Sequence, residues 1–133
     1  HFFRSALGGA RFSNANLRGA HMQEAAAMGA NFNGADLADA DMLMARLNGS
    51  NFENADMSGA DLEAAVLASA NLKLARLSGA RLTDTDFTNS NWWRARGLSS
   101  AQASSLRENF APSDNADEAL RRDYAAWLRE SGN

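Results

Sequence analysis

The chain contains no cysteine, one proline and two histidines among its 133 residues. The lack of cysteine excludes disulfide bonds and thiolate chemistry. No apolar run approaches the length of a membrane span, and no secretory signal is visible. The net charge of −3 is mild, so nothing indicates a basic surface for nucleic acid. We therefore expect no membrane segment and no bound nucleic acid, and we expect a cytoplasmic location. The first residue, His1 rather than Met, indicates a fragment or a processed product.

A five-residue repeat dominates the sequence. The stretch "GANFNGADLADADM" (residues 29–42) holds Ala, then Asn or Asp, then a bulky apolar residue three times. Neither a helix nor a strand has this period. With the bulky residue taken as the centre of each repeat, eighteen of the nineteen centres between positions 2 and 92 are large and apolar, and only Ala27 is small. The frame runs from residue 2 to residue 96 without an insertion.

Two positions of each repeat are expected to point inward. One is the centre, and the other is two places before it, where Ala is replaced only by Ser5, Ser50, Thr85 and Ser90. A large and a small side chain interlock in a narrow core. The position two places after the centre is often Gly, Asn or Asp, which tolerate the positive φ of tight turns. Each repeat is therefore predicted to be a short extended side followed by a corner.

Matching residues recur every twenty positions, which predicts four sides in each coil. Asparagine lies immediately before a centre at Asn31, Asn51, Asn71 and Asn91. Stacked amides that bond to each other along the axis are a sufficient structural reason for this column. Aspartate recurs in the same way at two pairs of positions, Asp36 with Asp56 and Asp41 with Asp61. A fifteen-residue coil would break most of these matches.

The phrases "ANLRG" (residues 15–19), "ADLAD" (35–39), "ADMSG" (55–59) and "ANLKL" (70–74) resemble the pentapeptide-repeat family. The resemblance implies an all-β solenoid, a right-handed quadrilateral β-helix, which we assign to residues 1–97. It also implies that the side chains of the centre residues point into the interior of the coil. The side chains that we expect in this core include Phe12, Leu17, Phe32, Leu37, Phe52, Met57, Leu62, Leu72, Leu77 and Trp92. Ala27 departs from the pattern because it is small, and we expect it to leave the core underfilled at its position.

Residues 98–133 lie outside the repeat and are expected to form a helical cap. The first helix, about residues 100–109, is predicted to end before Pro112. For the second helix, Asn115 is a plausible N-cap with Glu118 three places on. Its apolar face is expected to close the last coil beneath Trp92 and Trp93 through Leu120, Tyr124, Trp127 and Leu128. A dimer contact is the alternative role for this helix.

Catalytic and metal-binding patterns are lacking. His21 falls at an outward position, the serines have no partner base, and no cluster has metal-ligand spacing. We therefore expect a non-enzymatic protein without a cofactor or a bound metal. A rigid scaffold for protein–protein interaction, with an unidentified protein partner, fits the repeat best. Self-association is expected to use the N-terminal end around Phe2, Phe3 and Leu7, which has no lid in this sequence.

Two outward surfaces are candidates for contact. By the twenty-residue rule, one edge of the coil carries Met28, Leu43, Met44 and Val66. An exposed apolar patch of this kind often marks a contact surface, and relaxed drift of the repeat is the alternative. The second surface is an acidic face made by Asp36, Asp41, Asp56 and Asp61.

The acidic face raises an alternative function. The alternative that the resemblance implies is a DNA-mimicking regulator of a type II topoisomerase (gyrase), as in quinolone-resistance pentapeptide proteins. Charge argues against it, because residues 1–97 carry ten acidic and nine basic side chains, a net charge of −1. Duplex DNA carries a negative charge about every 1.7 Å. The aspartate columns are better explained as a solvated face that prevents aggregation.

Overall fold

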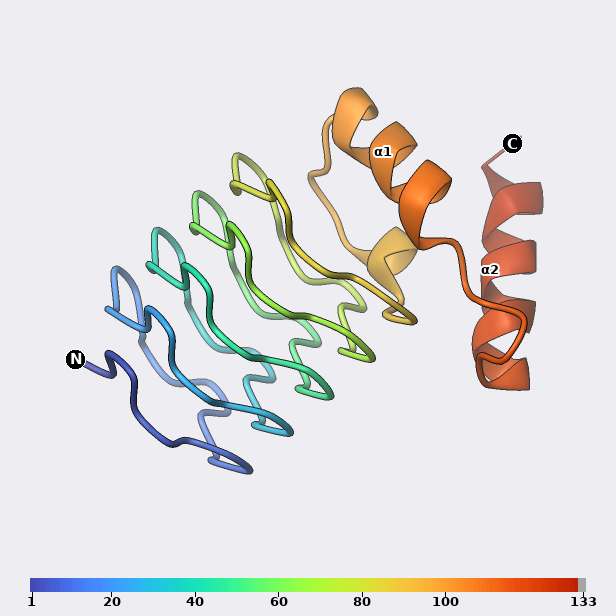
Figure 1. Cartoon of the computed structure of the whole chain (residues 1–133). Coiled ribbons are helices and arrows are strands. Elements are labelled where there is room, and N and C mark those ends of the chain that lie inside the picture. Colours follow the sequence, from blue (N-terminus) through green and yellow to red (C-terminus); the bar gives the residue numbers. More distant parts are fainter. Residues whose placement is uncertain (132–133) are drawn as a thin grey trace.

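The computed structural model describes residues 1–131, which form a stack of four-sided coils followed by two helices (Figure 1). Each coil takes twenty residues, because parallel β-bridges link residues twenty apart, from Ala6 with Ala26 to Arg76 with Arg96. The bridges are isolated rather than gathered into long strands, since a turn interrupts the chain every five residues. This arrangement agrees with the four-sided coil predicted from the sequence.

The corners are tight turns closed by the backbone. In one of them the carbonyl oxygen of Leu7 accepts a hydrogen bond from the N–H of Ala10 at 2.9 Å. The residue two places after the centre has a positive φ, as at Gly9 (68°) and Asn14 (59°). Glycine adopts this conformation without steric cost, but eleven non-glycine residues of the described chain also hold it. Met44 (57°) and Leu74 (61°) are the bulkiest apolar residues among these eleven.

Neighbouring coils are joined by backbone hydrogen bonds that run along the stacking direction. The N–H of Phe32 donates to the carbonyl of Asn51 in the next coil at 2.7 Å. The N–H of Asn51 donates to the carbonyl of Ala30 in the coil before at 3.0 Å. The same pair of bonds repeats at side after side of the stack. The backbone polar groups of a central coil are thus satisfied on both sides.

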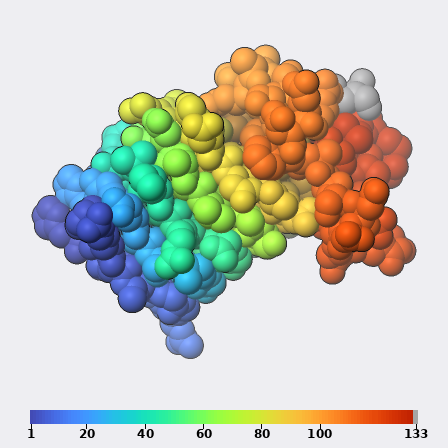
Figure 2. Space-filling model, in the orientation of Figure 1, coloured from blue at the N-terminus to red at the C-terminus, as the bar shows by residue number. Residues whose placement is uncertain are grey.

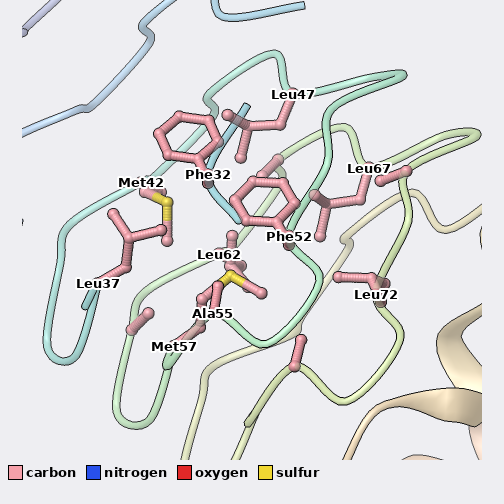
Figure 3. Close-up of a cluster of buried hydrophobic side chains, with 14 of the residues drawn as sticks. Phe32, Leu37, Met42, Leu47, Phe52, Ala55, Met57, Leu62, Leu67 and Leu72 are labelled. Carbon is pink, nitrogen blue, oxygen red and sulfur yellow. The ribbon is translucent and has the colours of Figure 1, made fainter. Parts of the chain in front are cut away.

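The centres fill the interior of the coil (Figure 3). All twelve centres from Met22 to Leu77 are fully buried, including the small Ala27. Phe32 and Phe52 stack face to face, with ring centroids 4.8 Å apart and planes 2° apart. Of the side chains expected in the core, those fully buried are Phe32, Leu37, Phe52, Met57, Leu62, Leu72, Leu77 and Trp92. Phe12 and Leu17 are half-buried, because the first coil has a neighbour on one side only.

The chain leaves the coil through a 3-10 helix, Trp92–Arg94, and continues into α1 (Ser100–Phe110) and α2 (Glu118–Glu130). Helix α1 agrees with the predicted first helix and begins with a capping box between Ser99 and Gln102. Asn115 as the N-cap of the second helix was wrong. The carboxylate of Asp117 accepts from the N–H of Ala119 at 2.7 Å and caps α2. An anionic acceptor next to the helix start satisfies a free N–H and complements the helix dipole.

Helix α2 packs its aromatic face against the end of the coil. The ring of Trp127 lies 5.5 Å from that of Trp92, and the ring of Tyr124 lies 4.9 Å from that of Trp93. Leu120, Tyr124 and Trp127 are half-buried and pack against the core, and Leu128 is half-buried as well. In the space-filling view the coils form one continuous body with the helical segment at its C-terminal end (Figure 2). Among residues 1–131, no helix has the length and apolarity needed to cross a membrane.

Candidate interaction surface

The apolar residues singled out in the sequence share one side of the coil. We call it side 2 and define it by the bridged column at its middle, Ala6, Ala26, Arg46, Val66 and Asp86. Leu43 and Met44 form the corner that precedes side 2, and Met28 lies at the corner that follows it. Met44 is 52% exposed and Met28 is 37% exposed, while Leu43 and Val66 are half-buried. The four residues therefore share one side rather than one edge, with Leu43 and Met44 at one corner, Met28 at the opposite corner and Val66 in the middle.

Side 2 is also made largely of small side chains. Its outward positions include the small residues Ala6, Gly8, Ala26 and Ala68. Arg46 is the long exposed exception in the middle of this surface. No sequence pattern singled out Arg46, although its place between Ala26 and Val66 follows from the twenty-residue rule.

The aspartates of each acidic column stack on one another, but an arginine occupies the next position of each column further along the coil. Asp36 bridges Asp56, which bridges Arg76, and the guanidinium of Arg76 lies 3.9 Å from the carboxylate of Asp56. In the neighbouring column Asp61 lies 3.6 Å from Arg81. These pairs leave no continuous negative stripe along the coil.

The aspartates also have a local structural role. A carboxylate oxygen of Asp56 accepts from the hydroxyl of Ser58 at 2.6 Å and from its N–H at 3.0 Å. The hydroxyl of Ser58 is the main cause that holds the pKa of Asp56 below its ordinary value, with help from Arg76. Asp36, Asp41 and Asp61 make the same backbone bond to the residue two places on. These are Asx turns, which shape the corner and explain why Asn or Asp precedes so many centres.

The asparagine column is a partial amide ladder. The side-chain amide of Asn71 donates to Asn51 at 3.2 Å, and that of Asn91 donates to Asn71 at 2.9 Å. The side-chain oxygen of Asn91 also accepts from the N–H of Leu72 at 2.5 Å. It replaces the backbone carbonyl that the coil no longer supplies where the 3-10 helix begins. This column is therefore part of the structure of the coil.

A cleft of about 630 Å³ lies between the last coil and the start of α2, and two of its charged side chains, Arg94 and Asp123, bond to each other and hold the helix. Arg94 makes two hydrogen bonds to the carboxylate of Asp123, at 2.9 and 2.7 Å, and the indole N–H of Trp93 donates to the same carboxylate at 2.8 Å. Chiefly through the hydrogen bonds from Arg94, the pKa of Asp123 lies below its ordinary value. Within residues 1–131, no three His, Asp or Glu side chains gather closely enough to hold a metal ion.

The comparisons with known proteins agree with this geometry. The family model "Pentapeptide repeats" matches in eight copies, over residues 5–42, 28–54 and 45–84. No curated protein matches the sequence. A pentapeptide repeat protein from the thylakoid lumen of Arabidopsis thaliana is 29% identical, with a TM-score of 0.70 over 91% of this chain and 87% of that chain. A pentapeptide repeat protein from Nostoc PCC 7120 is 34% identical, with a TM-score of 0.59 over 60% of this chain and 66% of that chain. These neighbours support a right-handed β-helix.

Proposed function

Because the chain belongs to the pentapeptide repeat family, we propose that it is a rigid, non-enzymatic scaffold that contacts a partner protein through side 2. The observation that carries the proposal is the group of exposed apolar side chains on that side. Met44 and Met28 hold their side chains in solvent although neither the core nor a neighbouring coil requires an apolar residue there. Flexible methionine side chains on a firmly hydrogen-bonded backbone suit adaptable contact on a fixed frame.

The test is a pair of substitutions that changes the surface and spares the core. Leu43→Lys with Met44→Glu should leave the β-helix intact, because both positions point outward at a corner. Leu74→Glu is the matched control, since Leu74 is 40% exposed at a corner far from side 2. In affinity capture, we expect the wild type and the Leu74→Glu variant to retain the same partner proteins. The double variant should no longer retain them. Identical retained proteins for all three would refute a contact function of side 2.

We further propose that residues 98–133 form a cap domain on the repeat domain, residues 1–97. The support for this division is the packing of Tyr124 and Trp127 on Trp92 and the bond between Arg94 and Asp123. An end coil has lost one neighbour, so an apolar helix face that covers it restores burial. The cytoplasmic location stays a prediction, since one similar structure comes from a thylakoid lumen.

Self-association through the N-terminal end also stays a prediction. In the first coil Phe3 is 55% exposed, and Phe2 and Leu7 are half-buried. If the protein is a dimer, we expect Phe2→Lys with Phe3→Lys to dissociate it in sedimentation velocity. A dimer that survives this change would exclude the N-terminal end as its contact.

The charges do not support DNA mimicry. Residues 1–20 carry three arginines and no acid, residues 21–66 carry eight acids and one arginine, and residues 67–97 carry five bases and two acids. The coil is thus banded in charge, unlike the uniform phosphate backbone of a duplex. In a gyrase supercoiling assay we expect neither inhibition nor protection from a quinolone. Either effect at stoichiometric protein would favour the topoisomerase alternative.

A further inference from the structure

Arg46 is a charged side chain whose nearest neighbours in its own column are apolar. In its column it bridges Ala26 on one side and Val66 on the other. The corners that flank it carry Met44 before side 2 and, one coil earlier, Met28 after it. Arg46 is exposed, and no ion pair to it is found in the described part of the chain.

Most other arginines in the coil have carboxylate partners. Arg18 lies 3.7 Å from Asp36, and Arg81 lies 2.9 Å from Glu63. In these cases an acid occupies the same or the adjacent column one coil away. Side 2 offers small or apolar residues at the corresponding places, so the guanidinium of Arg46 keeps all its donors for solvent or for a partner.

Because Arg46 is charged and unpaired within the described residues, a partner that covers side 2 must supply a group that can pair with it. A partner that buries Met28, Met44 and Val66 also removes water from Arg46. Burying a guanidinium without a counter-charge is strongly unfavourable, whereas a carboxylate can accept two parallel hydrogen bonds from it. A purely apolar partner is therefore rejected, and an acidic one is selected.

We propose that side 2 binds a short segment of a partner protein in which a carboxylate, placed on Arg46, is flanked by apolar side chains. The inference rests on the proposed function, since it names the partner chemistry of the same surface. Arg46 acts as the charged anchor, and the methionines at the two corners hold the apolar neighbours of the carboxylate.

The size of side 2 favours a segment over a second copy of the chain. Three extended residues span about 10 Å, and three stacked coils rise about 10 to 15 Å. A flat strip of this size offers on the order of 150 Å² before the corners are added. A stable interface between two folded proteins buries about 800 Å² on each partner. A single extended segment matches the strip, and a face-to-face dimer would not bury enough surface.

The experiment is selection of a phage-displayed library of random twelve-residue peptides against the immobilised protein. We expect the enriched peptides to share Asp or Glu flanked by Leu, Ile, Met or Phe. Synthetic copies of these peptides should bind Arg46→Ala at least about tenfold more weakly in fluorescence polarisation, as expected for a lost charged hydrogen bond. Arg11→Ala is the matched control, because Arg11 is exposed at the middle of another side and has no ion pair among residues 1–131. Its affinity should equal that of the wild type.

The outcomes separate the two proposals. The selected peptides could lack an acid and lose their binding with Leu43→Lys and Met44→Glu but keep it with Arg46→Ala. This result would overturn the role of Arg46 and leave side 2 as a contact surface. Peptides that ignore both sets of substitutions would refute both proposals. Concentration-dependent dimerisation abolished by Arg46→Ala would identify a second copy as the occupant and overturn the segment.

Discussion

Substituting Leu37 by Asp places a carboxylate inside the coil, and the structure gives the size of the effect. Leu37 is fully buried on a side where Leu17 and Met57 are the centres of the neighbouring coils. Losing a buried leucine costs about 2 to 5 kcal/mol, and the unpaired carboxylate adds several kcal/mol. The sum approaches the whole stability of a small domain, about 5 to 15 kcal/mol. Because each coil is stabilised by its neighbours, one failed coil also uncouples the two parts of the stack.

Asp36→Ser, one residue away, is the control. Asp36 points outward, accepts from the N–H of Ala38 at 3.0 Å and pairs with Arg18 at 3.7 Å. Serine can make the same local bond more weakly, and an exposed ion pair contributes about 0 to 1 kcal/mol. We expect urea unfolding, followed by far-ultraviolet circular dichroism, to show a loss below about 1 kcal/mol for Asp36→Ser and no folded baseline for Leu37→Asp. Similar unfolding midpoints for the two variants would refute the inward and outward assignment.

Three further predictions follow from other parts of the structure. Leu74→Gly should raise the stability by about 0.5 kcal/mol, because Leu74 has a φ of 61° and a largely exposed side chain; a Gly variant less stable than Leu74→Ala in urea would contradict this. Asp123, whose pKa is lowered mainly by Arg94, should contribute stability that is present above its ordinary pKa of 3.8 and lost as the pH falls through its lowered value in the folded protein. Acid should therefore destabilise the wild type more than Asp123→Asn in urea titrations, and parallel pH profiles would count against the bond. Removing all residues from Ser113 onward should cost about 3 kcal/mol or more and promote association, because Trp92 and Trp93 lose their cover; a stable monomer in sedimentation would show that α2 is no cap.

The sequence was sufficient for the register of the coil. A strict period of five identifies which side chain points inward at each side, and matches at twenty set the number of sides. Both signals are local and repeat many times, so a single exception such as Ala27 does not disturb the frame. The place of positive φ followed from the same count, although residues such as Leu74 occupy it without any preference for that conformation.

The C-terminal contacts could not be predicted in the same way. The bond between Arg94 and Asp123 joins residues 29 positions apart that belong to no repeat. The start of α2 depended on a choice between two nearby capping residues, and Asp117 rather than Asn115 is placed to reach a free N–H. The isolation of Arg46 depends on what its neighbours lack, which appears only once the columns are laid side by side.

The direction of the hydrogen bonds between coils has a mechanical consequence. The bonds from Phe32 to Asn51 and from Asn51 to Ala30 lie along the stacking direction, so tension applied between the two ends of the stack loads them one side at a time. The coils should then unfold one after another from an end. Each unfolded coil of twenty residues releases up to about 70 Å of chain in place of a rise of about 5 Å. Tension applied across the sides would instead shear many bonds together. The same stack is therefore compliant when stretched along its axis and stiff when pulled across it.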